Sequence, residues 1–275
     1  MSVSKIKNLI LLILVLAVIG LLPAVVPAQA ARMGAERNVH EKLEALYSAY
    51  GLTLHAEDLP VSQTLYSIEL EDPDASDAAQ ALLGGKAEQE PSAAGTLAGF
   101  ISESGTFSLT RSGDLTARLT QASAAHDLTR ATKRYLRSMD FSIAALTEPT
   151  RTSAGVYTLT AQQSLFGVPV FESELVFTYR NSALSYVEGT FYPSAQAARV
   201  SEDACISCAD ALVALLSNRD SLGWVGSEVT ACEQGYLHSE TASSALRFVP
   251  VWRIETDAGA FYVNGITREV RQIAS

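Results

Sequence analysis

Histidine and cysteine are scarce in this chain of 275 residues, which holds four of the first and three of the second. The histidines fall in separate expected elements, so no two of them are spaced as a catalytic pair. The chain also lacks the His-Glu-x-x-His, Gly-x-Ser-x-Gly, phosphate-loop and dinucleotide-binding glycine patterns that hold catalytic or cofactor groups. These absences predict a protein that is not an enzyme and that uses no cofactor, metal or small-molecule substrate.

Basic residues are also in the minority, because 30 acidic side chains face only 20 lysines and arginines. A surface with this balance repels the phosphates of nucleic acids, which we therefore exclude as partners. One cluster runs against the balance, with cations at i, i+3, i+4 and i+7 along one side of an expected helix: Arg130, Lys133, Arg134 and Arg137. This stripe is either a solvated face with local ion pairs, or a docking site for an acidic partner or a clamp between units of the chain.

Charge is absent from residues 9–28, an apolar run long enough to cross a bilayer core of roughly 20 residues. Lys5 and Lys7 precede the run, which predicts a cytoplasmic N-terminus, a single-pass anchor over residues 1–31 and an extracytoplasmic remainder. The run is longer than a usual signal-peptide core, so we expect it to be retained, although "AQA" offers cleavage after Ala30 as the alternative. Small residues step along one face of this segment as a candidate transmembrane contact: Ala17, Gly20 and Ala24.

After the anchor, the pattern of a helix followed by antiparallel strands recurs at a spacing of about 75 residues. The first unit covers 32–122 and includes a juxtamembrane helix that ends at Gly51. The second covers 123–198, with a helix capped near Asp127, and the third covers 199–275, with a helix over 201–220. The sequence therefore predicts an α+β fold: a transmembrane helix, then repeated modules of one helix on an antiparallel sheet.

The third unit carries all three cysteines. We expect Cys205 and Cys208 on one face of the helix over 201–220 and Cys232 in the strand that follows. A redox dithiol is disfavoured because Cys205 would lie a full turn inside the helix, and a zinc site with His238 is disfavoured because no knuckle loop presents the thiols. Two alternatives stay open: a structural disulfide from Cys232 to one helix cysteine, or small buried apolar side chains.

The last hairpin alternates apolar and polar residues from Phe248 to Glu255. This alternation places Phe248, Pro250, Trp252 and Ile254 on the inner face of the third unit's sheet. Proline cannot donate a hydrogen bond to a ladder, so Pro169 and Pro250 predict that their strands lie at sheet edges.

Two stretches, "VFTYRNSALSYVEGTFYP" and "FVPVWRIETDAGAFYVNGITREV", resemble the closing strands of PepSY-type modules. The order of anchor, juxtamembrane helix, "ALLGG" helix and "FISESGTFSL" hairpin resembles the YycH and YycI regulators of Gram-positive bacteria. One departure is Arg268, which stands where the family's last turn usually has glycine.

The resemblance implies a non-enzymatic, membrane-anchored ectodomain that modulates an essential sensor kinase governing cell-wall metabolism. Its implied partner is that kinase or a related regulator. The alternative is a secreted PepSY-like protease inhibitor or folding assistant, which requires cleavage after Ala30.

Overall fold

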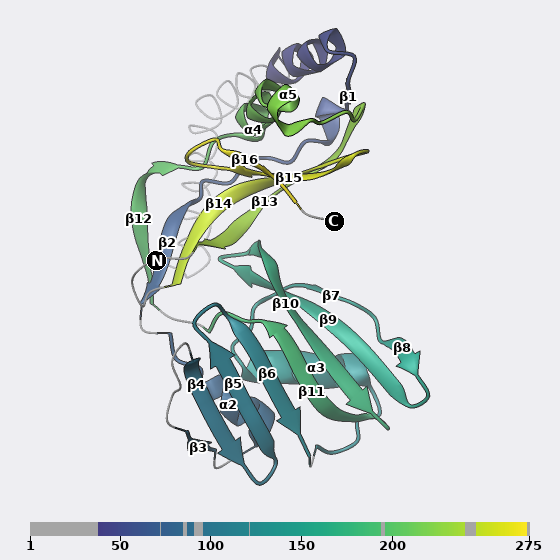
Figure 1. The fold of residues 1–275 in the computed structure, drawn as a ribbon, viewed down its shortest axis with the longest axis vertical. Coiled ribbons are helices and arrows are strands. Elements are labelled where there is room, and N and C mark those ends of the chain that lie inside the picture. Colours follow the sequence, from purple (N-terminus) through teal and green to yellow (C-terminus); the bar gives the residue numbers. More distant parts are fainter. Residues whose placement is uncertain are drawn as a thin grey trace, which may run out of the picture.

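The computed structural model describes residues 38–71, 73–84, 87–90, 96–120, 122–193, 196–239 and 246–273. The anchor predicted over 1–31, with Ala17, Gly20 and Ala24, lies outside these residues. Within the described ranges, no helix has the length and apolar character needed to cross a membrane. The described chain forms two mainly antiparallel sheets, each covered on one face by helices (Figure 1).

Sheet B holds the middle of the chain, in the order β3-β4-β5-β6-β11-β10-β9, with β7 and β8 one after the other along the outer edge of β9. Its strands are β3 (Glu88–Gln89), β4 (Thr96–Ser102), β5 (Gly105–Thr110), β6 (Asp114–Leu119), β7 (Ile143–Leu146), β8 (Thr150–Ser153), β9 (Val156–Leu165), β10 (Val168–Arg180) and β11 (Ala183–Thr190). Helices α2 (Ser76–Leu83) and α3 (Leu128–Ser138) pack on one face and share a core with it. The buried aromatic residues Phe107, Phe177 and Tyr179 lie in that core.

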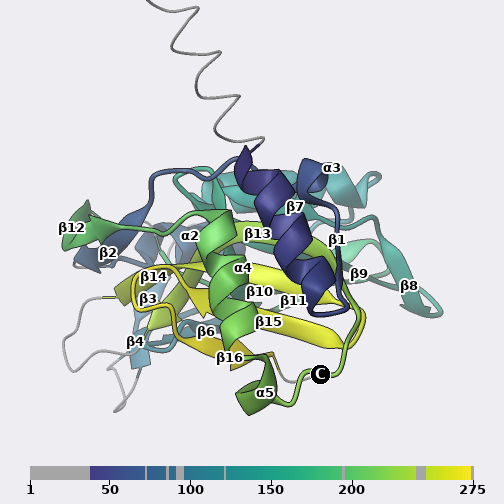
Figure 2. The ribbon, with the colours of Figure 1, turned by 90° about the horizontal axis from the view of Figure 1, so that it is seen from above.

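Sheet A combines the two ends of the described chain, in the order β12-β2-β14-β13, with β15 also on β14. Its strands are β1 (Thr53–Leu54), β2 (Tyr66–Glu71), β12 (Gln196–Ala204), β13 (Glu228–Ser239), β14 (Leu246–Thr256), β15 (Gly259–Asn264) and β16 (Val270–Gln272). The helix over 38–49 and α4 (Cys208–Ser217) lie side by side across this sheet (Figure 2), and α5 (Arg219–Leu222) follows α4. The Tyr47 hydroxyl donates a hydrogen bond of 2.9 Å to the Leu212 carbonyl, which ties the two helices together. A 3-10 turn, η1 (Ala56–Asp58), connects β1 toward β2.

Strand β10 joins the two sheets. Its first residues pair with β9, Val170 then pairs with Tyr236 of β13, and the strand returns to β9 from Glu174 onward. The register shift that permits this includes Glu172, whose φ of 65° bends the strand as a bulge does. The two sheets are thus connected through the backbone of one continuous strand.

The α+β class with helices on antiparallel sheets is confirmed for the described residues. Elements of the predicted first module, 32–122, lie in both sheets, because β2 pairs in sheet A while β3 to β6 pair in sheet B. Elements from 123–198 lie mainly in sheet B and those from 199–275 in sheet A. The module boundaries themselves stay predictions.

The prediction of a helix over 201–220 is wrong at its start. Residues up to Ala204 belong to β12, and α4 begins only at Cys208. The cap is Ser207, whose Oγ accepts the Asp210 N–H at 3.1 Å, because its extended backbone leaves the side chain free to satisfy a first-turn donor. Cys205 and Cys208 therefore do not share a helix face.

The edge positions predicted from the two prolines are also wrong. β14 lies between β13 on one side and both β2 and β15 on the other. Pro250 is tolerated there because β2 pairs only as far as Phe248 and β15 begins at Val251, so its missing N–H falls between two partner strands. Pro169 likewise lies within β10, where it pairs with Ser164 of β9 just before Val170 pairs with Tyr236 of β13.

The turn before β16 contains Arg268, which stands where the last turn of the YycH and YycI regulators usually has glycine. This residue has a φ of 64°, in the left-handed region that glycine adopts without steric cost. The Asn264 side-chain oxygen accepts the N–H groups of Ile266 and Thr267, at 2.9 and 3.0 Å, and so holds the turn. The chain thus keeps the glycine-type turn conformation with an arginine in it.

Candidate partner-binding site

Helix α3 is fixed on sheet B by its cap and its buried side. The Asp127 carboxylate accepts the Arg130 N–H at 2.9 Å, as predicted for the cap. Leu136 and Met139 pack into the core of sheet B, and the hydroxyls of Thr132 and Tyr179 form a buried hydrogen bond of 2.8 Å. These contacts set the rotation of α3 about its axis, so the opposite side of the helix must face outward.

The outward side carries the predicted stripe, which we call the cationic face: Arg130, Lys133, Arg134 and Arg137. All four side chains are exposed, and within the described residues none of them forms an ion pair. Arg134 also lies over the Tyr135 ring, with 5.9 Å between its guanidinium carbon and the ring centroid. The local salt bridges of the first alternative are thus absent from the described part, although the carboxylates of Asp127 and Asp140 line the hollows beside the face.

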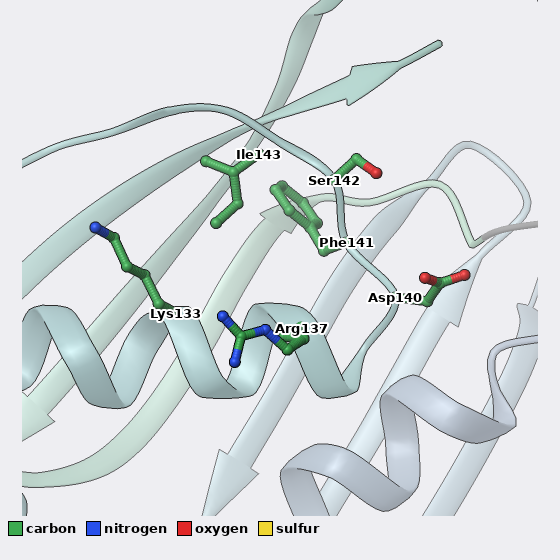
Figure 3. A pocket seen from close by; sticks show the side chains of 6 residues that line it. All are labelled: Lys133, Arg137, Asp140, Phe141, Ser142 and Ile143. Atoms are coloured by element: carbon green, nitrogen blue, oxygen red, sulfur yellow. The ribbon is translucent and has the colours of Figure 1, made fainter. Parts of the chain in front are cut away.

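Two hollows flank the cationic face. The larger, of about 790 Å³, lies between the first turns of α3 and residues 123–127. The smaller, of about 340 Å³, is shown in Figure 3, where Lys133 and Arg137 project from α3 on the side of the segment that carries Ile143. Lys133 and Arg137 line both hollows, so the two form one continuous cationic surface.

The candidate disulfide residues are brought together only in part. The Cys208 thiol is hydrogen-bonded to Cys232, and this contact and burial raise the pKa of Cys208. Cys205 lies apart from this pair, against Gln234, Trp252 and the backbone at Gly265, and burial raises its pKa as well. A raised pKa keeps a thiol protonated and poorly nucleophilic at neutral pH, so this arrangement does not suit redox catalysis.

His238 lies against aromatic rings. Its ring centroid is 5.0 Å from that of Tyr192 and 5.8 Å from that of Phe248, two residues of a core cluster against which Cys205, but neither Cys208 nor Cys232, also packs. In the ranges that the structure describes, no three His, Cys, Asp or Glu side chains are placed to share a metal ion.

The cysteine geometry makes a prediction. Under oxidising conditions we expect a disulfide between Cys208 and Cys232, with Cys205 left as a thiol, because only the first two thiols are in contact. Closing this loop is worth about 3.5 kcal/mol in the chain-entropy model. Peptide mapping by mass spectrometry, after thiol blocking without reduction, measures the pairing. The Cys205→Ser variant is the control that should keep the same bond, whereas a Cys205–Cys208 bond would contradict the placement.

Two features of the structure were not predicted from the sequence. One is the free edge of β7, which the short run "IAAL" does not distinguish from a buried strand. The other is an apolar hollow of about 360 Å³ between the helix over 38–49, residues 59–62 and the start of α4. Both depend on which elements become neighbours, and no local pattern encodes that.

The fold and the site define an α+β protein of two joined sheets that exposes a cationic helix face. The family model described as YycI protein matches residues 74–266, and the chain belongs to the YycI family. The resemblance to that family is thereby confirmed. YycI is a regulatory family associated with the YycG/WalK two-component system.

Solved structures show more distant likeness. An uncharacterized protein from Eubacterium rectale ATCC 33656 has a TM-score of 0.47 and 10% identity, over 79% of this chain and 88% of that chain. The YpeB C-terminal domain of Bacillus megaterium has a TM-score of 0.35 and 13% identity, over 73% of this chain and 96% of that one. A search of curated proteins found no match.

Proposed function

We propose that this protein is a single-pass membrane protein whose extracytoplasmic part regulates a sensor kinase of a cell-wall-related two-component system, without catalysis of its own. The observation that carries the proposal is the family match over residues 74–266. The uncharged run over 9–28 supports the anchor, with Ala17, Gly20 and Ala24 as the contact stripe for the partner's membrane helix.

The cationic face is the proposed contact surface for the kinase's extracytoplasmic part. Its four cations are exposed and lack ion pairs among the described residues, on a chain whose net charge is −10. A local charge of opposite sign to the rest of the surface orients a partner during encounter, and it disfavours binding in other orientations. The helix over 38–49, which follows the proposed anchor, packs in the core of sheet A, whereas α3 packs in that of sheet B. The proposed surface is thus on the sheet that does not hold the juxtamembrane helix.

Charge reversal tests this proposal. Changing Arg130, Lys133, Arg134 and Arg137 to Glu is expected to lower recovery of the kinase at least tenfold, since about 1.4 kcal/mol of lost binding suffices for that factor. The measurement is crosslinking followed by pull-down from membranes that contain the full-length chain.

The matched control reverses four exposed arginines elsewhere: Arg111, Arg151, Arg180 and Arg268. This control has the same net charge as the test variant but an intact cationic face, so it should recover the kinase normally. Equal recovery with both variants would exclude the cationic face as the contact surface.

A further inference from the structure

Strand β7 has a free edge. Among the described residues it pairs with β9 alone. The Thr147 N–H donates to the Thr160 carbonyl at 2.9 Å, and the Ser164 N–H donates to the Ser142 carbonyl at 2.8 Å. These bonds turn positions 142 and 147 toward β9. A register shift between Ile143 and Ala145 interrupts the alternation of the strand, so Ile143, next to position 142, and Leu146, next to position 147, both point their backbone groups away from β9.

This edge carries neither charge nor proline, although β7 is only four residues long and has a register shift between Ile143 and Ala145. Exposed edge strands are normally blunted by charged residues, by proline, by bulges, by short length or by a covering element, because they otherwise pair with another chain. The sequence of β7 is "IAAL", without charge or proline, and its first three residues are exposed. Ile143 is 39% exposed although it is a large apolar residue. The edge is therefore chemically suited to strand addition.

The cationic face lies directly beside this edge. Ile143 lines the same hollow as Lys133 and Arg137, and so does the buried Phe141, two residues earlier in the chain (Figure 3). Alternate side chains of a strand point to the same face of a sheet. In a strand added to β7, every second side chain would therefore point toward α3, where carboxylates would meet Lys133 and Arg137 in the hollow that Asp140 also lines.

We propose that the groove between α3 and the edge of β7 binds an extended acidic segment of a protein partner as an additional strand of sheet B. Backbone hydrogen bonds to Ile143 and Leu146 supply part of the affinity, and Lys133 and Arg137 select carboxylates at alternate positions. The identification of that partner as the sensor kinase rests on the proposed function above, whereas binding of the segment does not.

The test uses the full-length chain in detergent micelles and a fluorescent ten-residue peptide of alternating Glu and Val. Fluorescence anisotropy should show binding that weakens at least tenfold with Lys133→Glu/Arg137→Glu, but not with the matched pair Arg111→Glu/Arg180→Glu. A peptide of alternating Lys and Val should not bind. Far-UV circular dichroism should show that both variants remain folded.

Two N-methylated forms of the peptide separate strand addition from general attraction of anions. One carries methyl groups on the Glu backbone nitrogens and the other on the Val nitrogens. Only one of these sets faces β7 in an added strand, so we expect one form to lose binding at least tenfold and the other to retain it. Equal affinity of both forms, with polyphosphate competing through Lys133 and Arg137, would overturn the proposal in favour of a polyanion site.

The two proposals fail in different ways. If the cationic face is needed for kinase recovery but neither the peptide nor its methylated forms bind, strand addition is wrong and the proposed function stands. If the peptide binds as expected but kinase recovery is unaffected by charge reversal, the groove is a peptide site whose partner is another protein.

Discussion

Replacing Trp252 with alanine is expected to lower the free energy of unfolding by about 3–5 kcal/mol, the range for truncating a large buried aromatic residue. Trp252 is 0% exposed and lies in the core of sheet A, between the sheet and α4. Its indole N–H donates to the Ile206 carbonyl at 2.9 Å, just before the Ser207 cap of α4. Urea unfolding followed by far-UV circular dichroism measures the loss.

The two tryptophans provide a matched comparison that isolates the hydrogen bond. Trp252→Phe removes the donor and leaves the part-buried Ile206 carbonyl without it, at a cost of about 1 kcal/mol. Trp224→Phe removes an indole N–H that is buried and has no hydrogen-bond partner among the described residues. Trp224→Phe should therefore be the milder change. An equal loss in both variants would show that the bond to Ile206 contributes nothing beyond packing.

The position of Trp252 was predictable because strand alternation is a local property. Side chains two residues apart share a face, so the run from Phe248 to Glu255 identifies its own inner side. Phe248, Trp252 and Ile254 are all fully buried, which confirms that prediction. The Asp127 cap was predictable for the same reason, since it depends on a side chain and an N–H three residues apart.

The start of α4 was not predictable in this way. Ser201 and Ser207 are both suitable caps by local pattern, and the choice between them depends on β2, more than 100 residues earlier. β12 pairs with β2, the Ser201 hydroxyl accepts the Ser67 N–H at 2.9 Å, and Arg199 stacks 3.5 Å above the Tyr66 ring. These distant contacts hold residues up to Ala204 extended and leave Ser207 as the first free cap.

The candidate site also combines a part that local sequence patterns predict and a part that they do not. The spacing of Arg130, Lys133, Arg134 and Arg137 sets one helix face, so the cationic face could be predicted from the sequence alone. The β7 edge beside it could not, because an edge exists only once the order of strands in sheet B is known. The proposed groove combines a local feature with one that arises from the topology.

Adding one methyl group at Gly235 is expected to lower the free energy of unfolding by about 1–3 kcal/mol, the usual cost of overpacking. Gly235 lies on β13 where β10 crosses from sheet B to sheet A, next to the pair of Val170 and Tyr236. A Cβ at this position would lie 2.5 Å from the Pro169 carbonyl oxygen and 2.7 Å from the Phe171 ring. The obstacle includes backbone, so a change of side-chain rotamer cannot relieve it.

Gly99→Ala is the control, since Gly99 is also a strand glycine, and its added Cβ would meet only Glu90, at 3.7 Å. That variant should change stability by less than about 1 kcal/mol, and toward greater stability, because alanine restricts the unfolded chain. Denaturant unfolding measures the free energy of unfolding of both variants. If the Gly235→Ala protein were as stable as the Gly99→Ala protein, β10 could shift freely over β13. The expected contrast instead makes the close approach of these two backbones a fixed contact. That contact sets how sheet B, with its cationic face, is held relative to sheet A and the helix over 38–49.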